Sequence, residues 1–205
     1  MLSVGLTGSI AVGKSFVSEV LTECGCYVLD ADRTAREVVL PGTIGLQSVV
    51  AEFGVEVLHI DGTLDRGKLG ALIFNDDNQR ARLNAILHPL IRVAHEEWLR
   101  GVAATDSRAV AVIDAALMIE SGSYQMFDQL IVAHCRPEIQ LDRLVKRNKL
   151  AGDEAARRIA SQMPQEEKMR FADFLIDTSN GFEEARRRTV EVYVQLKRLA
   201  EMKGA

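Results

Sequence analysis

Residues 2–16 of this 205-residue chain read LSVGLTGSIAVGKSF, and they contain the pattern G-x-x-x-x-G-K-S between Gly8 and Ser15. The apolar residues before Gly8 fit a buried strand, and those after Lys14 recur at helical spacing. This strand, loop and helix context is the one that a phosphate-binding loop requires. A glycine-rich turn with a chance lysine would seldom lie at the first strand-to-helix turn, so the motif predicts a nucleotide phosphate site.

The residue types in this loop suit a triphosphate. Gly8 and Gly13 permit backbone conformations and a close ligand approach that a side chain would block, so successive amides can point at phosphate oxygens. We expect the Lys14 ammonium to reach the β and γ phosphates, where it would serve catalysis as well as binding. The Ser15 hydroxyl is expected to join the coordination shell of a Mg²⁺ ion that bridges these phosphates.

Composition limits the class of protein. With 47% apolar residues, the chain can bury one substantial core, which suits a single domain with insertions. A net charge of −4 argues against nucleic acid as the main partner. No apolar run approaches the roughly 18 to 20 residues that span a bilayer, and no charged leader precedes the first strand. We expect a cytoplasmic monomer or small homo-oligomer that has no membrane partner.

The cysteines are Cys24, Cys26 and Cys135. Their number and spacing match neither a disulfide framework nor a zinc site. We expect reduced and mostly buried thiols, and a redox switch at Cys24 and Cys26 is the less favoured alternative.

Apolar segments alternate with longer helical patterns, which favours a parallel sheet flanked by helices. The predicted fold is an α/β, three-layer P-loop NTPase fold with a five-stranded parallel sheet, a helical substrate-binding insertion and a small helical lid. Right-handed crossovers place the loops after the strands at one edge of the sheet, where ligands bind. The predicted strands are 2–7, 27–29, 109–113, 130–134 and 174–176.

Two insertions interrupt the alternation. The long one reads as several helices, and Pro89 is placed at the opening of the last of them. We expect a core of residues 1–31, 104–142 and 171–205, a substrate-binding insertion at 32–103 and a lid at 143–170. The helices predicted in the long insertion are 43–53, 66–74, 78–86 and 89–102.

The second insertion is strongly basic. A lid that compensates phosphate charge and excludes water is the functional interpretation, because its ends join the strand edge. A solvated charged face, supported by pairs such as Asp142 and Lys146, is the alternative. Its basic residues are Arg143, Lys146, Arg147, Lys149, Arg157, Arg158, Lys168 and Arg170.

Two predicted strands end in carboxylates. Asp30 and Asp32 follow the second strand, and Asp32 is the candidate base that would accept the proton of an acceptor hydroxyl. A helix N-cap is the alternative for each of them. Asp114 closes the third strand as in a Walker-B segment, and it would hold Mg²⁺ through water.

Along nearly its whole length the sequence resembles the dephospho-coenzyme A kinase family. The DAD block with its later Pro-Gly and the LHPLIR block are more specific to that family than the phosphate loop. The matching blocks are GLTGSIAVGKS, DADRTAREVVLPG, DGTLDRGKLGALIF, LNAILHPLIR, DAALMIESG, QLDRLVKRN, RIASQM and ADFLIDTSNG.

The resemblance implies transfer of the γ-phosphate of ATP to the ribose 3′-hydroxyl of dephospho-coenzyme A, with Mg²⁺ as cofactor. It assigns catalysis to Asp32, in agreement with the site argument, and implies that the long insertion binds the acceptor. The candidate acceptor-binding residues are Asp32, Arg36, His88, Arg92 and Glu120. The alternatives are a capping or packing role for His88, which precedes Pro89, and solvated surface positions for the two arginines. The implied ATP-binding residues are Gly8, Ala11, Val12, Gly13, Lys14, Ser15, Phe16, Arg143, Arg147 and Asn180.

The sequence departs from the usual family pattern at a few positions. The loop carries Ser9, Ala11 and Val12 in place of smaller, glycine-rich choices, and Phe16 in place of a second hydroxyl after Ser15. Before Glu120, the sequence of residues 116–119 differs from the common Pro-Leu-Leu-Phe.

Three other functions compete with this interpretation. A nucleoside monophosphate kinase would share the core and lid, but the DAD and LHPLIR blocks argue against it. A regulatory GTPase needs an N-K-x-D motif, and here Asn148 and Lys149 are followed by Leu150 and Ala151. A binding module without acceptor chemistry would have no use for Asp32 or a basic lid.

Overall fold

The structure is a computed structural model and describes residues 1–74 and 76–204. Within these residues, five parallel strands form one sheet in the order β2-β3-β1-β4-β5. The predicted sheet is confirmed, and each strand lies within one residue of its expected bounds. The strands are β1 (Leu2–Thr7), β2 (Tyr27–Asp30), β3 (Val110–Asp114), β4 (Gln129–His134) and β5 (Phe174–Asp177).

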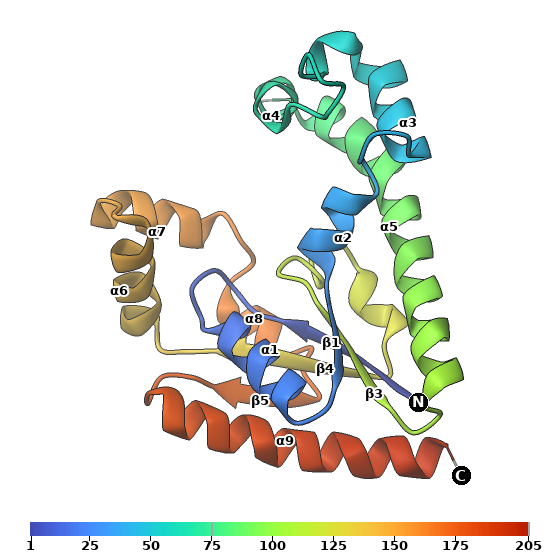
Figure 1. The fold of residues 1–205 in the computed structure, drawn as a ribbon. Coiled ribbons are helices and arrows are strands. Elements are labelled where there is room, and N and C mark those ends of the chain that lie inside the picture. Colours follow the sequence, from blue (N-terminus) through green and yellow to red (C-terminus); the bar gives the residue numbers. More distant parts are fainter. Residues whose placement is uncertain (75, 205) are drawn as a thin grey trace. The chain divides into compact units, whose positions relative to one another are not determined.

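Helices follow the strands in the order that the alternating pattern predicts (Figure 1). Two short 3₁₀ turns lie at Val55–Val57 and Ser123–Met126. The helices are α1 (Lys14–Glu23), α2 (Ala31–Glu37), α3 (Ile44–Phe53), α4 (Arg66–Ile73), α5 (Asp77–Thr105), α6 (Pro137–Asn148), α7 (Gly152–Ala160), α8 (Gln165–Met169) and α9 (Phe182–Lys203).

The chain divides into two compact units. Residues 1–30 with 99–205 form the sheet unit, and residues 31–98 form the helical unit. The end of the insertion predicted at 32–103 falls inside α5, and the start of the lid predicted at 143–170 falls inside α6.

The core of the sheet unit lies between the sheet and two helices that run alongside each other, α1 and α9 (Figure 1). Leu6 on β1, Val17 on α1 and Leu196 on α9 are completely buried in one apolar cluster. The central strands β1 and β3 are buried along their whole length, as in sheets that are covered on both sides. This packing fixes β1 and α1, and therefore holds both ends of the phosphate loop.

The long helix α5 corrects one prediction. The sequence predicts separate helices at 78–86 and 89–102, whereas the structure has one helix with Pro89 in its interior. An interior proline removes one backbone hydrogen bond and costs about 3 kcal/mol or more. Packing on both sides of Pro89 offsets this loss, because Leu83 joins the apolar core of the helical unit and Leu90 lies close to Gly45 on α3.

The thiols lie as expected. Cys26 and Cys135 are buried, Cys24 is partly exposed, and none forms a disulfide. Burial raises the pKa of the Cys26 thiol to about 12, so this group stays protonated and unreactive at neutral pH. None of the helices in the described ranges is both long and apolar enough to cross a lipid bilayer.

Candidate active site

The phosphate loop joins β1 to α1 with a tightly constrained backbone. Gly13, immediately before α1, has φ +90°, in the left-handed region that favours glycine. Gly8 is required for a different reason, since a Cβ there would lie 2.5 Å from the carbonyl oxygen of Ala133. Ala11 adopts φ +62°, a left-handed conformation that is costly for a residue with a side chain. The loop therefore has the left-handed turns and the close backbone approach that the sequence motif predicts, although one of the left-handed positions is an alanine.

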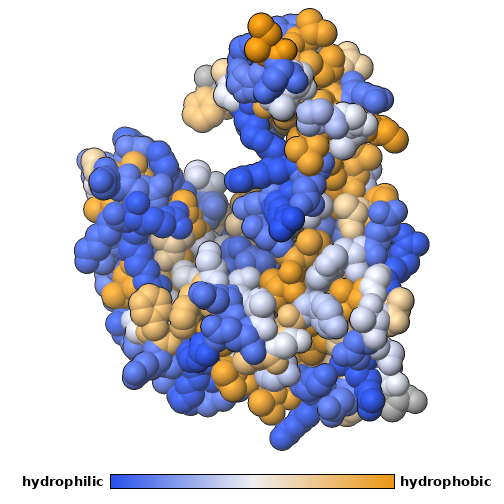
Figure 2. Space-filling model, viewed as in Figure 1, coloured by the Kyte–Doolittle hydropathy of each residue, from blue (hydrophilic) through white to orange (hydrophobic). Residues whose placement is uncertain are grey.

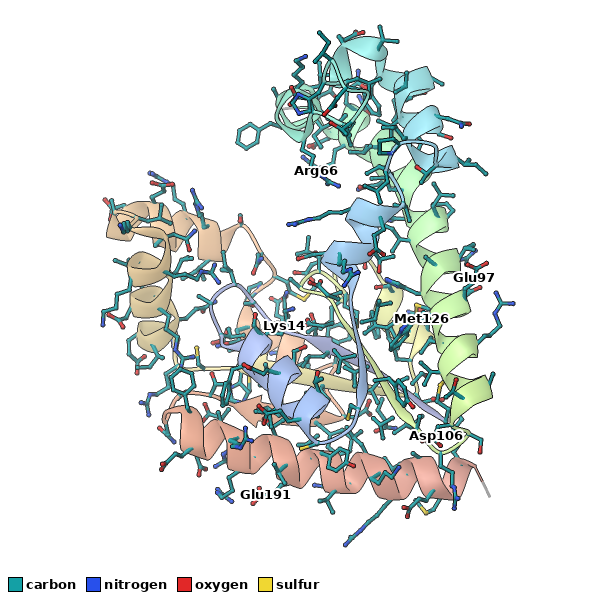
Figure 3. All side chains as sticks on the ribbon, in the orientation of Figure 1. Lys14, Arg66, Glu97, Asp106, Met126 and Glu191 are labelled. Carbon is teal, nitrogen blue, oxygen red and sulfur yellow. The ribbon has the colours of Figure 1, made fainter. Side chains whose placement is uncertain are left out.

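Lys14, in the first turn of α1, forms an ion pair with Asp114 at the end of β3. Figure 3 shows Lys14 at the carboxyl edge of the sheet, where the sequence predicts ligand binding. Asp30 is paired with Asp114 in the register of β2 and β3. Burial raises the pKa of the Asp114 carboxyl, and Asp30 adds to this effect, while Lys14 and Ser18 oppose it.

Beside this ion pair, Ser15 is exposed and Val12 is buried. The hydroxyl of Ser15 and the carboxylate of Asp114 are the hard oxygen ligands that Mg²⁺ prefers. Their chemistry therefore fits the predicted metal site. Ser9, one of the loop positions that depart from the family pattern, has a buried hydroxyl without a hydrogen-bond partner among the described residues.

Arg143 on α6 is hydrogen-bonded to the phosphate loop and to Thr178, which follows β5. Its Nη1 donates to the Val12 carbonyl at 3.4 Å and to Thr178 Oγ1 at 2.9 Å, and its Nη2 donates to the Thr178 carbonyl at 2.7 Å. The Thr178 hydroxyl also donates to the Val12 carbonyl, at 2.5 Å. The structure thus brings Arg143 to the predicted ATP site, where it contacts protein groups of the loop.

The other predicted ATP ligands lie on the surface. Arg147 is exposed, and its Nε donates to Oδ1 of Asn148 at 2.8 Å. Asn180 is exposed in the turn between β5 and α9, where its Oδ1 accepts from Arg136 at 3.3 Å. Phe16 follows Ser15 and contacts Phe182, with ring centroids 4.9 Å apart.

Two glutamines that the sequence argument missed hold the loop at Ile10. Gln162 accepts a hydrogen bond from the Ile10 amide at 2.8 Å, and Gln140 donates to the Ile10 carbonyl at 2.8 Å. Both lie in blocks that carry the family resemblance, Gln140 at the start of QLDRLVKRN and Gln162 in RIASQM, but the residue type alone does not indicate a contact with the loop. Both come from the segment around α6 and α7, which therefore supports the loop directly.

The surface of α6 and α7 is mainly hydrophilic (Figure 2). The expected pair of Asp142 and Lys146 forms there at 2.9 Å. Lys168, which the sequence places with the basic lid, is different, because its side chain is fully buried in α8. Its Nζ lies 2.7 Å from Oε1 of Glu120, a residue predicted to bind the acceptor.

The remaining predicted acceptor residues belong to the helical unit. Asp32 lies exposed in the first turn of α2, and Arg36 lies exposed in its last turn. His88 and Arg92 are exposed one turn apart on α5, and Nε of Arg92 is 3.8 Å from Oε1 of Glu96. Asp32 is therefore inside the helix and does not serve as the N-cap that was its alternative role.

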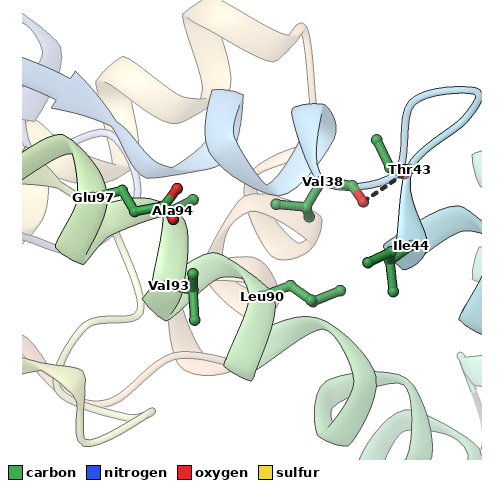
Figure 4. A pocket seen from close by; sticks show the side chains of 8 residues that line it. Val38, Thr43, Ile44, Leu90, Val93, Ala94 and Glu97 are labelled. Carbon is green, nitrogen blue, oxygen red and sulfur yellow. Dashed lines mark hydrogen bonds between the residues drawn. The ribbon is translucent and has the colours of Figure 1, made fainter.

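The helical unit also contains an open, mostly apolar pocket between α5, the start of α3 and the turn that follows α2 (Figure 4). Val38, Leu90 and Val93 supply much of its apolar wall. The Thr43 hydroxyl donates to the Val38 carbonyl at 2.9 Å and caps α3 by accepting from the Leu46 amide. This hydrogen bonding fixes the turn at one side of the pocket.

Comparison with known proteins gives one consistent result. The sequence model of the dephospho-CoA kinase family matches residues 2–184. A dephospho-CoA kinase from Streptomyces avermitilis is 45% identical over 204 residues, which cover 100% of this chain and 98% of that protein. The structure of a Campylobacter jejuni dephospho-CoA kinase superposes with a TM-score of 0.65 at 26% identity, covering 95% of this chain and 96% of that one.

A more distant structure shows how widely the fold is shared. Shikimate kinase from Acinetobacter baumannii gives a TM-score of 0.52 at 17% identity, with 96% of this chain and 92% of that chain covered. At this level of identity the likeness concerns the fold alone.

Proposed function

This chain belongs to the dephospho-CoA kinase family, and from that premise we propose how its residues carry out the reaction. The enzyme transfers the γ-phosphate of ATP to the ribose 3′-hydroxyl of dephospho-CoA, giving CoA and ADP. The observation that carries the proposal is the phosphate loop whose Lys14 meets Asp114 at the carboxyl edge of the sheet.

We propose that Asp32 accepts the proton of the 3′-hydroxyl as its oxygen attacks the γ-phosphorus. The bond from that phosphorus to the β-phosphate oxygen of ATP breaks at the same time, and the electron pair leaves with ADP. Asp32 follows Asp30 by two residues, a length of chain that spans at most about 7 Å. Because Asp30 is in register with Asp114, chain connectivity supports a place for Asp32 near the phosphates.

On the nucleotide side, we assign the phosphates to the amides of the loop and to the Lys14 ammonium. Arg143 and Arg147 would add positive charge from α6, and Asn180 would lie at the base. Ser15 directly, and Asp114 through water, would hold Mg²⁺, which neutralises charge on the β and γ phosphates when it is bound. Preorganised charge of this kind stabilises the transition state without reorganisation.

The acceptor is assigned to the helical unit. Dephospho-CoA carries a diphosphate, and Arg36 and Arg92 present exposed guanidinium groups that suit such an anion. His88 lies one turn from Arg92 on the same helix and would add a hydrogen bond. Closure of the helical unit and of the predicted lid over both substrates would exclude water.

One experiment tests the activity and its selectivity together. Purified protein is given Mg²⁺ and ATP with dephospho-CoA, adenylate, cytidylate or adenosine, and the mass of each product is recorded. We expect phosphorylation of dephospho-CoA, with at least about 100-fold lower kcat/KM for the others, because they lack most of the contacts made by the helical unit. Preference for a monophosphate would indicate a nucleoside monophosphate kinase. The cytoplasmic location and the small assembly expected from the sequence remain predictions.

A further inference from the structure

Lys168 is a fully buried lysine that the mechanism above does not use. Its side chain has 0% exposure, and its Nζ lies 2.7 Å from Oε1 of Glu120 and 3.1 Å from the carbonyl oxygen of Ala116. A buried ammonium is costly unless it is paired and hydrogen-bonded, and removing one partner of such a pair leaves the other charge uncompensated. Because Lys168 has no exposed surface in this structure, phosphate binding is a poor explanation for it.

Both acceptors of Lys168 lie in the segment that follows β3, residues 115–120. The Ala116 carbonyl also accepts from the hydroxyl of Thr7, at 3.1 Å. Thr7 ends β1 and immediately precedes the phosphate loop, while Ala116 lies two residues after Asp114. The Ala116 carbonyl therefore accepts from both the Lys168 ammonium and the end of β1, and it lies in the segment that directly follows Asp114.

The helix that carries Lys168 is itself fixed to the sheet. Gln165, one turn earlier on α8, accepts from the Cys135 amide at 3.0 Å and donates to the Cys135 carbonyl at 2.7 Å. The amide of Met163, just before α8, donates to Oε1 of Glu120 at 3.4 Å. The ammonium is thus held on a rigid support, as a group that positions others must be.

We infer that Lys168 is a positioning residue, which holds the segment after β3 through Ala116 and Glu120 and thereby keeps Asp114 in place opposite Lys14. Glu120 is then the counter-ion of Lys168 and does not contact the acceptor. This inference rests on the proposed function, since the turnover of dephospho-CoA is what it affects. It corrects the sequence-based grouping of Lys168 with the arginines of the lid.

The test compares Lys168→Met, Glu120→Gln and the double variant Lys168→Met/Glu120→Gln. Lys197→Met is the matched control, because Lys197 is partly exposed on α9 and, within residues 1–74 and 76–204, donates a hydrogen bond only to the Arg108 carbonyl, at 3.3 Å. For each protein, kcat and KM for ATP and for dephospho-CoA are measured well below its melting temperature. Wild-type turnover in the same assay tests the proposed function separately.

We expect Lys168→Met to lower kcat by about 10- to 100-fold with both KM values within threefold of wild type. In the double variant the unpaired carboxylate is gone, so thermal stability should recover while kcat stays low. Glu120→Gln keeps an acceptor for Lys168 and should leave KM for dephospho-CoA within threefold. Lys168→Arg, which retains the charge, should restore part of kcat and serves as the variant to measure if Lys168→Met does not fold.

Three outcomes would overturn the inference. A folded Lys168→Met enzyme with kcat within twofold of wild type would show that the ion pair serves stability alone. Recovery of kcat together with stability in the double variant would show the same. A large rise in KM for dephospho-CoA in Glu120→Gln, with kcat unchanged, would show that Glu120 binds the acceptor.

Discussion

The Nζ of Lys14 donates a hydrogen bond to Oδ1 of Asp114, so the first residue of α1 is tied to the last residue of β3. The two strands that carry these residues, β1 and β3, are neighbours in the sheet, with Leu6 in register with Asp114. The contact places the only charged residue of the phosphate loop beside the carboxylate assigned to the metal. A nucleotide bound in the loop would meet both groups at once.

Replacing Lys14 by Met should therefore affect binding and chemistry together. We expect kcat to fall by roughly 10² to 10³, the range found when one preorganised donor to the transition state is removed, and KM for ATP to rise. Steady-state formation of CoA and calorimetric titration with ATP measure the two effects. The control Lys197→Met should change neither, and a Lys14→Met enzyme with normal kcat would remove Lys14 from the catalytic site.

Ala11 provides a test of the loop's backbone. Its φ of +62° costs a residue with a side chain roughly 1–2 kcal/mol, whereas glycine adopts this conformation freely but loses more entropy on folding, roughly 0.5–1 kcal/mol. Ala11→Gly should thus leave the free energy of unfolding unchanged or raise it by about 1 kcal/mol. Urea denaturation measures this value.

The matched control is Ala156→Gly, at an exposed position inside α7. There the same change should destabilise the protein by about 1 kcal/mol, because glycine is a poor helix former. Equal losses in the two variants would contradict the strain assigned to Ala11.

Asp128 predicts how the stability of the sheet unit depends on pH. Burial alone would raise the pKa of this carboxyl, but hydrogen bonds from Lys203 and Ser3 outweigh burial and lower it from the ordinary value of 3.8. The Ser3 amide donates at 2.8 Å, and Lys203 Nζ lies 2.5 Å and 2.6 Å from the two carboxylate oxygens. Since the folded-state pKa is the lower one, the stabilisation is present above about pH 4 and is lost as the pH falls below it.

Asp128→Asn should accordingly be less stable than wild type by about 1–2 kcal/mol at pH 7, a value discounted for the partial exposure of Lys203. The difference should shrink as the pH drops from about 4 toward 2. Chemical denaturation of both proteins at several pH values gives the comparison. A difference that stays constant across this range would show that the charge of Asp128 does not contribute.

Much of the sheet unit could be predicted from the sequence because its signals are local. The phosphate loop fixes a strand and a helix around it, and short apolar runs such as Val110–Asp114 are recognisable without knowledge of the fold. The continuous helix through Pro89 could not be predicted, since the packing of Leu83 and Leu90 that supports it depends on distant residues. Local rules predict a break at proline, and here this prediction is wrong because tertiary packing opposes it.

The candidate site likewise contains residues that could be predicted from the sequence and residues that could not. The sequence argument found the residues whose type and motif carry chemical meaning, such as Lys14 and Asp114. It assigned no role to Gln162 and Thr178, which hold the loop, although both lie in blocks that carry the family resemblance, because a single polar residue in a helix or turn does not indicate which group it contacts. Lys168 was grouped by its charge with the surface arginines, and only the three-dimensional contacts reveal that it is buried against Glu120.

The central claim is that the phosphate loop binds ATP while the carboxylate of Asp32 takes the proton of the acceptor. The most direct measurement is single-turnover phosphorylation of dephospho-CoA by Asp32→Asn, together with its Kd for ATP. Asp77→Asn is the matched control, because Asp77 is also an exposed carboxylate in the first turn of a helix of the helical unit. We predict a loss of turnover on the order of 10² to 10⁴ for Asp32→Asn, the size expected for a general base, with Kd for ATP within about threefold of wild type. Turnover at the wild-type rate in Asp32→Asn would contradict the account.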